Sequence, residues 1–225
     1  MKVLIACEES QEVCKAFREK GHEAYSADIK ECSGGHPEWH INGDVIPLLN
    51  GDCTLHLQNG ETKEIKGSWD MIIAHPPCTY LTNCGTRWYS LRVTDAETVA
   101  KRWEDRAKAA VFFMYFVGAK CEKIAIENPV GFMSTSYRKP DQYVNPWMWA
   151  EKVGDENYHA KKTGLWLKGL PLLKSNGIFQ NFDCSYYGKW GSGKNKTWED
   201  SYSRDAGVRS KTFSGIAKAM AEQWG

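Results

Sequence analysis

Residues 2–28 read KVLIACEESQEVCKAFREKGHEAYSAD, and this stretch decides the fold class. It begins with a short run of β-branched and other apolar residues, which is typical of a buried strand. Ser10 can then cap a helix that ends at Lys20 and Gly21, where a basic last turn precedes the glycine common after helices. A second strand candidate, HEAYSAD, ends on Asp28. Strand, helix and strand within about 30 residues predict a βαβ unit at the start of a parallel sheet.

The same alternation of strands and helices continues along the chain. A helix is predicted after Thr94, which forms a capping box with Glu97, and another over residues 210–224. Residues 54–65, TLHLQNGETKEI, alternate polar and apolar residues around Asn-Gly and predict a β-hairpin. Three further runs are typical of buried strands: WDMIIA at 69–74, KIAIENP at 123–129 and GLWL at 164–167. The pattern predicts an α/β fold with a mostly parallel sheet.

The predicted elements divide the chain into three parts. Residues 1–135 are expected to form the α/β core, with residues 51–66 as an exposed hairpin insertion. Residues 136–205 are basic and richer in loops, and they are expected to elaborate that core. Residues 206–225 are expected to pack back on the core as a helix. A chain of 225 residues is long enough for one substantial core of this kind.

Composition and the lengths of the apolar runs argue against a membrane-spanning or secreted protein. Hydrophobic residues make up 42% of the chain and charged residues 25%, which is ordinary for a soluble globular protein. No apolar stretch approaches the ~20 residues that span a bilayer, and the short apolar run near the start is too short for a signal peptide. We therefore expect an intracellular, cytoplasmic protein with no membrane partner, in the bacterial host cytoplasm if a phage encodes it.

Eight cysteines are scattered through strand-like and helix-like segments, so reduced thiols are expected. CxxC pairs are absent from the sequence, which gives little support for a four-cysteine zinc site. The residues closest to a metal-binding pattern are Cys32, His36 and His40, whose spacing fits no common template. We expect a polar loop there and no metal.

The net charge of +1 conceals an uneven distribution. Residues 160–212 contain ten Lys or Arg residues and only four acidic residues, interleaved with aromatic ones. This asymmetry suits a polyanion such as a nucleic acid. A solvated basic face is the other interpretation.

Polar residues gather at four predicted strand ends: Cys7–Ser10, Asp28, His75–Cys78 and Glu127–Pro129. Ligands of open α/β sheets bind outside the carboxyl ends of the strands, so these residues are expected to share one site. An acidic residue after the second strand suits ribose hydroxyls, but a GxGxxG turn is missing after the first strand. A nucleoside cofactor without a pyrophosphate, such as S-adenosylmethionine, therefore fits better than a nicotinamide dinucleotide.

Pro76-Pro77-Cys78 and Glu127-Asn128-Pro129, each after a predicted strand, resemble the Pro-Cys and Glu-Asn-Val motifs of DNA (cytosine-5) methyltransferases. Three longer segments look like the small members of this family that phages and prophages encode: AHPPCTYLTNCGTRW, KKTGLWLKGLPLL and KTFSGIAKAMAEQW. The resemblance implies a Rossmann-like class I S-adenosylmethionine-dependent methyltransferase fold. Residues 136–205 would then be a reduced target-recognition region.

By this resemblance Cys78 is the nucleophile. Its thiolate adds to carbon 6 of cytosine while Glu127 protonates ring nitrogen 3, and carbon 5 then takes the methyl group. The chemistry requires a thiol made more acidic by its surroundings and a carboxyl group whose pKa is raised by burial. Asn128 belongs to the same motif, and Lys162 takes the place of a basic residue that grips the base or a phosphate. Two alternatives are a buried structural Cys78 and a reactive Cys84 in the following loop.

The resemblance also assigns binding residues. Cofactor contacts are expected from Ala6, Cys7, Glu8, Ser10, Asp28, Asp44, His75 and Pro76, with Asp28 on the ribose and Asp44 near the adenine amino group. The family's glycine-containing first turn is replaced here by Ile5–Ser10 without glycine, so its location carries over but not its details. By the same resemblance Arg87 and Trp88 are expected to contact the nucleic acid. The lysines and aromatic residues of segment 186–198 independently suggest further contacts, from Lys189, Trp190, Lys194 and Lys196, with Trp198 as a further stacking residue. A solvated surface loop is the other interpretation of these last residues.

The expected function is methylation of DNA at cytosine carbon 5, on a duplex with base flipping or on a single strand, by a monomer or weak dimer. Methylation of an exocyclic amine, N4 of cytosine or N6 of adenine, is the alternative within the class, because HPP partly matches the motif of those enzymes. They carry an aromatic residue where this chain has Cys78, which argues against them. A catalytically inactive nucleic-acid-binding or anti-restriction protein is the alternative from another class, favoured by the missing glycines.

Overall fold

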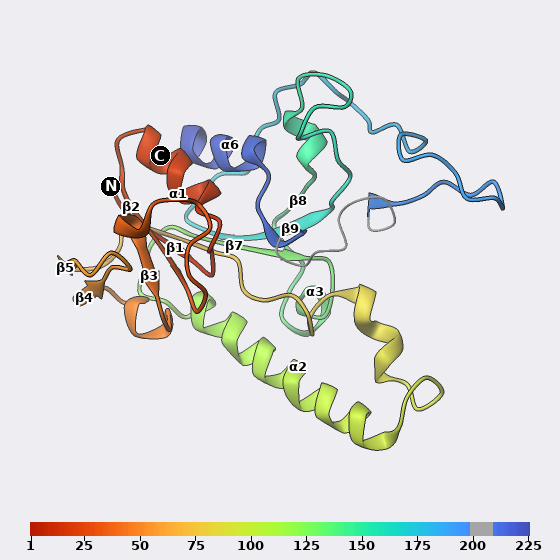
Figure 1. The fold of residues 1–225 in the computed structure, drawn as a ribbon, viewed down its shortest axis with the longest axis horizontal. Helices are drawn as coiled ribbons and strands as arrows, with labels where there is room; N and C mark the ends of the chain where they lie inside the picture. The colour runs from red at the N-terminus through yellow and green to blue at the C-terminus, as the bar shows by residue number, and fades with distance from the viewer. Residues whose placement is uncertain (199–208) are drawn as a thin grey trace.

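The computed structural model describes residues 1–198 and 209–225 (Figure 1). Four charged residues of the basic stretch lie outside these ranges: Glu199, Asp200, Arg204 and Asp205. The last part of the expected target-recognition region therefore also lies outside the described residues.

The described residues form a seven-stranded sheet in the order β3-β2-β1-β6-β7-β9-β8. The strands are β1 (Lys2–Ala6), β2 (Glu23–Asp28), β3 (His40–Asn42), β6 (Met71–Ala74), β7 (Ile124–Pro129), β8 (Gln142–Val144) and β9 (Thr163–Lys168). The first five strands of this order run parallel, whereas β9 is antiparallel to both of its neighbours. The predicted α/β fold with a mostly parallel sheet is confirmed, because each predicted apolar run supplies one buried strand.

Helix α1 spans Glu12–Glu19, and the predicted cap Ser10 makes no capping hydrogen bond to it. Glu8 takes this place: its carboxylate accepts hydrogen bonds from Val13 N at 2.6 Å and Cys14 N at 3.1 Å. Burial raises the pKa of Glu8, and the positive charge of His75 and these two hydrogen bonds oppose that rise. The buried Glu8 therefore holds the start of α1.

Helices cover both faces of the sheet. Helix α6 (Ser214–Trp224) packs against α1 on one face, and α2 (Ala96–Val117) crosses the other (Figure 1). Phe113 and Phe116 of α2 are fully buried, whereas Trp103, nearer its start, is 49% exposed. The C-terminal part of α2 thus packs on the sheet, and its N-terminal part extends beyond the sheet edge.

The start of α2 differs from the predicted capping box. Its N-cap is Asp95, whose Oδ1 accepts a hydrogen bond from Thr98 N at 2.8 Å. The prediction of Thr94 as the cap is therefore wrong by one residue. Both residue types are good caps, so the sequence pattern alone does not separate them.

The predicted hairpin is present as β4 (Cys53–His56) and β5 (Thr62–Ile65), which pair antiparallel in a small sheet of their own. Leu55 and Ile65 are buried and belong to the main core. The hairpin is therefore fixed to the body by one face and exposed on the other.

Residues 136–205 contribute more than loops, since β8 and β9 extend the main sheet. The described part of the chain as a whole also contains short helices: η1 (Pro37–Trp39), η2 (Ile46–Leu48), η3 (Asn83–Tyr89), α3 (Met133–Ser136) and η4 (Pro146–Trp149). Residues 188–196 form a narrow finger that projects from the body (Figure 1). Within it Lys189 and Asn195 form an antiparallel bridge, and Trp190 N donates to Lys194 O at 2.9 Å. Among the described residues, no helix has the length and apolar composition that crossing a membrane would require.

Candidate active site

The strand order places a switch point between β1 and β6. From β1 the chain continues through β2 to β3 on one side, whereas β6 and β7 lie on the other. In open α/β sheets this is the position at which ligands bind, outside the carboxyl ends of the strands. His75 N donates to Ala6 O at 2.9 Å, which fixes the end of β6 against that of β1, and Ala6 and Pro76 are both buried there.

His75 and Glu127 form a buried ion pair at the ends of β6 and β7. His75 Nδ1 lies 2.8 Å from Glu127 Oε2, and the two side chains are only 9% and 15% exposed. Burial disfavours the charged form of each residue, but their hydrogen bond and opposite charges outweigh it. The pKa of His75 is therefore raised and the pKa of Glu127 is lowered. The expectation that burial raises the pKa of Glu127 is wrong, because the sequence did not reveal His75 as its partner.

The second ring nitrogen of this histidine, His75 Nε2, is buried and has no hydrogen-bond partner in the described part of the chain. Two further charges act on the ring: Glu8, after β1, raises the pKa of His75, and Lys161, before β9, lowers it. Buried polar atoms are normally satisfied in a folded protein, so an unsatisfied one needs an explanation. The sequence assigned His75 only to the wall of the cofactor pocket.

Cys78 is half-buried on the turn that follows β6. Two later backbone N–H groups donate to its carbonyl oxygen, so the chain turns back directly after the thiol. Burial and then the charge of Glu127 raise the pKa of Cys78, and the positive charge of Lys161 opposes them. The expected acidification of the thiol is therefore not found. Cys84, the competing thiol, is exposed on η3.

Asn128 fixes the Pro-Pro turn that carries the thiol. Its Nδ2 donates to Pro76 O at 2.7 Å, and the residue is only 1% exposed. Pro76 belongs to the turn after β6, whereas Asn128 lies in β7, so this hydrogen bond ties the two strand ends together. Asn128 is thus a positioning residue for the segment that leads to Cys78.

Two adjacent lysines precede β9, and they point to different places. Lys162 is exposed, and its Nζ lies over the ring of Tyr143 at 4.4 Å. Lys161 is partly buried, and its charge acts on both Cys78 and Glu127. The Lys161 Nζ itself donates to Arg209 O at 2.9 Å and to Lys211 O at 3.4 Å. The charge of Lys161, and not that of the expected Lys162, therefore acts on the strand-end residues. Two lysines in a row carry no signal that would separate them before the strand register is known.

The turn after β1 adopts, without glycine, a backbone conformation that glycine favours. Cys7 and Gln11 have φ angles of 60° and 59°, which most side chains avoid. Cys7 N donates to Ala27 O at 2.7 Å, and the buried Gln11 side chain donates to His36 O at 2.8 Å. Hydrogen bonds thus hold a tight turn here without glycine.

Asp28 and Asp44 lie near this turn. Both negative charges add to burial in raising the pKa of the Cys7 thiol, so the three candidates share one region. Oδ1 of Asp28 accepts a hydrogen bond from Lys30 N, and Oδ1 of Asp44 accepts one from Ile46 N, each at 3.0 Å. These bonds fix the orientation of both carboxylates at the ends of β2 and β3.

Ile29 is a residue of this region that the sequence analysis missed. It follows Asp28 directly and is 80% exposed, which leaves an apolar surface beside the carboxylate. Glu8 and Ser10, by contrast, are both only 4% exposed, and the Glu8 carboxylate already binds α1. The signal in the sequence that could have identified Ile29 is an apolar residue directly after an acidic residue at the end of a strand.

The loop after the thiol is anchored to α2 by a cation stacked on aromatic rings. The Arg106 guanidinium lies 3.6 Å from the centre of the Tyr89 ring, and its Nε donates to Tyr80 O at 2.9 Å. On the loop itself Arg87 lies 4.8 Å from the Trp88 ring, and both side chains are exposed. The expected Arg87 and Trp88 are therefore accessible to a ligand.

The finger (residues 188–196) exposes most of the other expected nucleic-acid contacts. Lys189 and Lys194 are exposed, Trp190 is 48% exposed, and Lys196 Nζ lies 5.1 Å from the Trp190 ring. Trp198 is different, because it is only 4% exposed and belongs to the packed interior. The expectation that Trp198 stacks on bases is therefore wrong.

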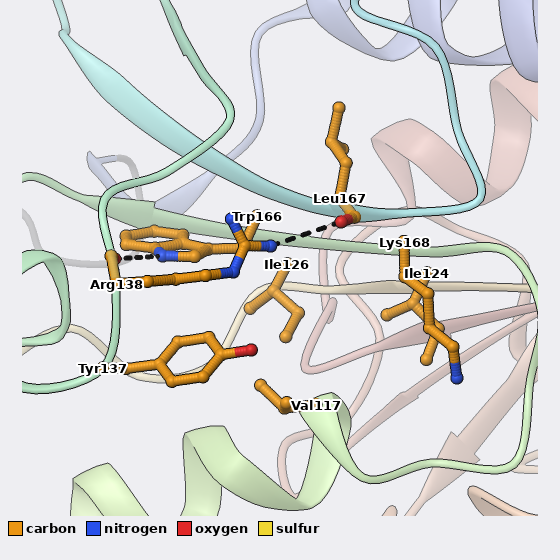
Figure 2. A pocket seen from close by; sticks show the side chains of 8 residues that line it. All are labelled: Val117, Ile124, Ile126, Tyr137, Arg138, Trp166, Leu167 and Lys168. Atoms are coloured by element: carbon orange, nitrogen blue, oxygen red, sulfur yellow. Dashed lines mark hydrogen bonds between the residues drawn. The ribbon is translucent and has the colours of Figure 1, made fainter.

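A hollow of about 220 Å³ lies elsewhere, between the end of α2 and the sheet (Figure 2). It is lined by Val117, Ile124, Ile126, Tyr137, Arg138, Trp166, Leu167 and Lys168. Trp166 Nε1 donates to Arg138 O at 2.8 Å, and the Arg138 guanidinium donates to Leu167 O at 3.3 Å. The hollow shares no residue with the strand-end site and is smaller than the ~300 Å³ of a typical ligand pocket. We therefore place the candidate active site at the strand ends, where the thiol, imidazole and carboxylate side chains gather.

The residues considered for a metal, Cys32, His36 and His40, do not converge. His36 Nδ1 lies 2.9 Å from Glu38 Oε1, whereas His40 Nδ1 lies 2.8 Å from Ser26 Oγ. Within residues 1–198 and 209–225, no three His, Cys, Asp or Glu side chains come together as metal ligands.

Comparisons with known proteins do not assign the site. No protein-family model matches the chain, and no curated protein sequence matches it. Function must therefore follow from the residues themselves.

Proposed function

We propose that the chain is an S-adenosylmethionine-dependent methyltransferase that modifies cytosine carbon 5 in DNA through Cys78. The observation that carries this proposal is the proximity of Cys78 and Glu127 at neighbouring strand ends, where the charge of Glu127 acts on the thiol. Addition of a thiolate to carbon 6, with an acidic group at ring nitrogen 3, requires this pair of groups in one site. Asn128 supports it by fixing the turn between them.

The first turn fits S-adenosylmethionine better than a dinucleotide. The amide groups at the start of α1, where a pyrophosphate would bind, are already taken by the Glu8 carboxylate. Asp28 would hold the ribose, Asp44 would approach the adenine amino group, and the exposed Ile29 would contact the purine face. When bound, S-adenosylmethionine supplies an electrophilic methyl group to this site.

DNA would be held by two exposed groups of side chains. Arg87 and Trp88 lie on η3, in the loop that follows the thiol. Trp190 and the lysines of the finger offer an aromatic face with cations beside it. Aromatic stacking and phosphate contacts of this kind suit a flipped or single-stranded base.

Nucleoside mass spectrometry of DNA from cells that express the chain tests this function. We expect 5-methylcytosine with the wild type and with Cys84→Ala, and none with Cys78→Ala, because the Cys78 thiol is the one on which the charge of Glu127 acts. Cys84→Ala is the matched control, since it removes an exposed thiol six positions further on. Equal methylation by Cys78→Ala and the wild type would exclude Cys78 as the nucleophile.

Other outcomes of the same experiment decide between the alternatives. N4-methylcytosine or N6-methyladenine would identify an exocyclic-amine methyltransferase. Unmodified DNA, together with no heat on titration of S-adenosylmethionine in a calorimeter, would favour a catalytically inactive nucleic-acid-binding protein.

A further inference from the structure

Two features of the site oppose a mechanism that uses Cys78 and Glu127 alone. The pKa of Cys78 is raised, so the resting sulfur is a protonated thiol. The pKa of Glu127 is lowered, so the resting carboxyl group is ionised and has no proton to give. Thiolate addition to cytosine requires the opposite of each, namely a group that takes the thiol proton and a group that supplies one to the base.

His75 binds Glu127 and lies on the turn that leads to Cys78, so it is the candidate for both roles. Its Nδ1 is bound to Glu127 at 2.8 Å, and its Nε2, on the other side of the ring, has no partner within the described residues. It lies on the same turn as Cys78, three residues earlier in the chain. A nucleophile, an imidazole and a carboxylate that orients the imidazole are the components of activated nucleophiles on unrelated folds.

We infer that His75 is the general base for Cys78, oriented by Glu127, and that it returns a proton through Glu127 to the target base. The second half of this inference rests on the proposed function, whereas the first half concerns the protein alone. His75 is thereby assigned to proton transfer. From the sequence it was expected only to line the cofactor pocket.

The protons and electron pairs of the addition step balance. The Sγ–H bond of Cys78 breaks, and its proton moves to Nε2, directly or across one water molecule. The sulfur electron pair forms the bond to carbon 6, and the displaced π electrons move to ring nitrogen 3. The Nδ1 proton of His75 passes through the Glu127 carboxylate to that nitrogen, so His75 ends neutral with one proton.

The charges around the imidazole set when it can act. Glu127 and Glu8 stabilise its protonated form, and Lys161 disfavours it. On the thiol side, Glu127 and Cys84 disfavour the thiolate and Lys161 favours it. The pKa of His75 is raised above its ordinary value of 6.5. The neutral imidazole, which accepts the thiol proton, therefore predominates only when the pH exceeds this raised pKa.

Alkylation of Cys78 by iodoacetamide tests the base directly. The rate is followed from pH 5.5 to 9.5 by mass spectrometry of the Cys78 peptide, with the exposed Cys184 as an internal control. In the wild type we expect the rate to level off once His75 is neutral. In His75→Gln we expect it to be at least about tenfold lower near pH 7.5 and to keep rising with pH, because only hydroxide then removes the proton. An unchanged profile for Cys78 in His75→Gln would overturn the inference.

A measurement on the unmodified protein covers the case in which His75→Gln does not fold. ¹⁵N NMR of the histidine rings reports which nitrogen carries the proton when His75 is neutral. We expect the proton on Nδ1, facing Glu127, and a free electron pair on Nε2. A proton on Nε2 in the neutral form would overturn the inference, because that nitrogen could not accept another.

Neither measurement uses DNA or a methyl donor, so the two proposals fail separately. Loss of the alkylation plateau in His75→Gln, without any methylation by the wild type, would support the base and reject the proposed function. Methylation by the wild type together with an unchanged alkylation profile would do the reverse.

Discussion

Asn128 is the residue on which the geometry of the turn depends most directly. Its amide donates to Pro76 O at 2.7 Å inside the protein. Asn128→Asp would place an acceptor against that carbonyl oxygen, and we expect it to lower the free energy of unfolding by roughly 1–3 kcal/mol, as for a buried group left unsatisfied. Urea unfolding measures the change. The matched control is Asn42→Asp, where an exposed amide donates to Ile29 O at 3.0 Å. An equal loss in both variants would contradict this account.

The His75–Glu127 pair predicts a window of pH in which it stabilises the protein. The folded-state pKa of His75 is raised, so its contribution is present below 6.5 and is lost as the pH rises through the folded value. The folded-state pKa of Glu127 is lowered, so its contribution is present above 4.5 and is lost as the pH falls through the folded value. Both contributions are complete between about pH 4.5 and 6.5.

We therefore expect Glu127→Gln to be less stable than the wild type by roughly 1–3 kcal/mol within that window, the range for hydrogen bonds to charged groups. The difference should shrink above it, where His75 loses its proton. Urea unfolding at pH 4, 5.5 and 8.5 measures the difference in free energy. A difference that grows steadily toward pH 8.5 would be incompatible with the pair.

The sequence predicted which strand ends carry the candidate site residues, because apolar runs followed by polar residues mark the carboxyl ends of buried strands. It did not predict which polar residues meet there. The pairing of His75 with Glu127 depends on the register of β6 against β7, in which Ala74 lies opposite Ile126. The choice of Lys161 over Lys162 likewise depends on where β9 begins. Such contacts join residues far apart in the chain, so no local pattern contains them.

At the scale of elements, the cap of α2 allows a sharp comparison of variants. Asp95 accepts hydrogen bonds from Thr98 N and Thr98 Oγ1, each at 2.8 Å, and these bonds lower its pKa to about 2. We expect Asp95→Ala to lower the melting temperature at pH 7 and Asp95→Asn to lower it less, because asparagine is also a good cap. The contribution of the charge is present above pH 3.8 and is lost as the pH falls through about 2. Thermal unfolding followed by circular dichroism gives both results, and equal effects of the two variants would argue against the cap.

For the finger (residues 188–196) we predict effects of substitutions on DNA binding and none on stability. Trp190 is half-exposed, and base stacking on such a ring contributes ~1–3 kcal/mol, so Trp190→Ala should weaken binding of single-stranded DNA roughly tenfold. Lys194→Ala, on the same finger, should instead lower the dependence of affinity on salt by about one unit of slope. Fluorescence anisotropy with a labelled oligonucleotide at several salt concentrations separates the two. Unchanged affinity in Trp190→Ala would exclude the finger as a stacking element.

At the scale of the whole molecule, the helix near the C-terminus joins parts of the fold that are distant in sequence. α6 packs against α1, and the Gln223 side chain exchanges hydrogen bonds of 2.8 Å with the backbone of Lys174. Trp224 Nε1 donates to Pro171 O at 2.9 Å. The sequence predicted this helix from its apolar face, but its partners depend on tertiary packing. One helix therefore ties the βαβ unit to the segment that follows β9.

Met220, on the buried face of α6, provides the test of that connection. It is fully buried, so Met220→Ala should lower the free energy of unfolding by about 2–5 kcal/mol through lost contacts and the cavity left behind. Lys218→Ala, on the exposed face of the same helix, should change it by less than about 0.5 kcal/mol. If α6 unites the molecule, tryptophan fluorescence and far-ultraviolet circular dichroism should report one shared urea transition in Met220→Ala, shifted as a whole. Two separated transitions would instead mean that the βαβ unit and the region after β9 unfold independently, and that α6 only covers the surface of α1.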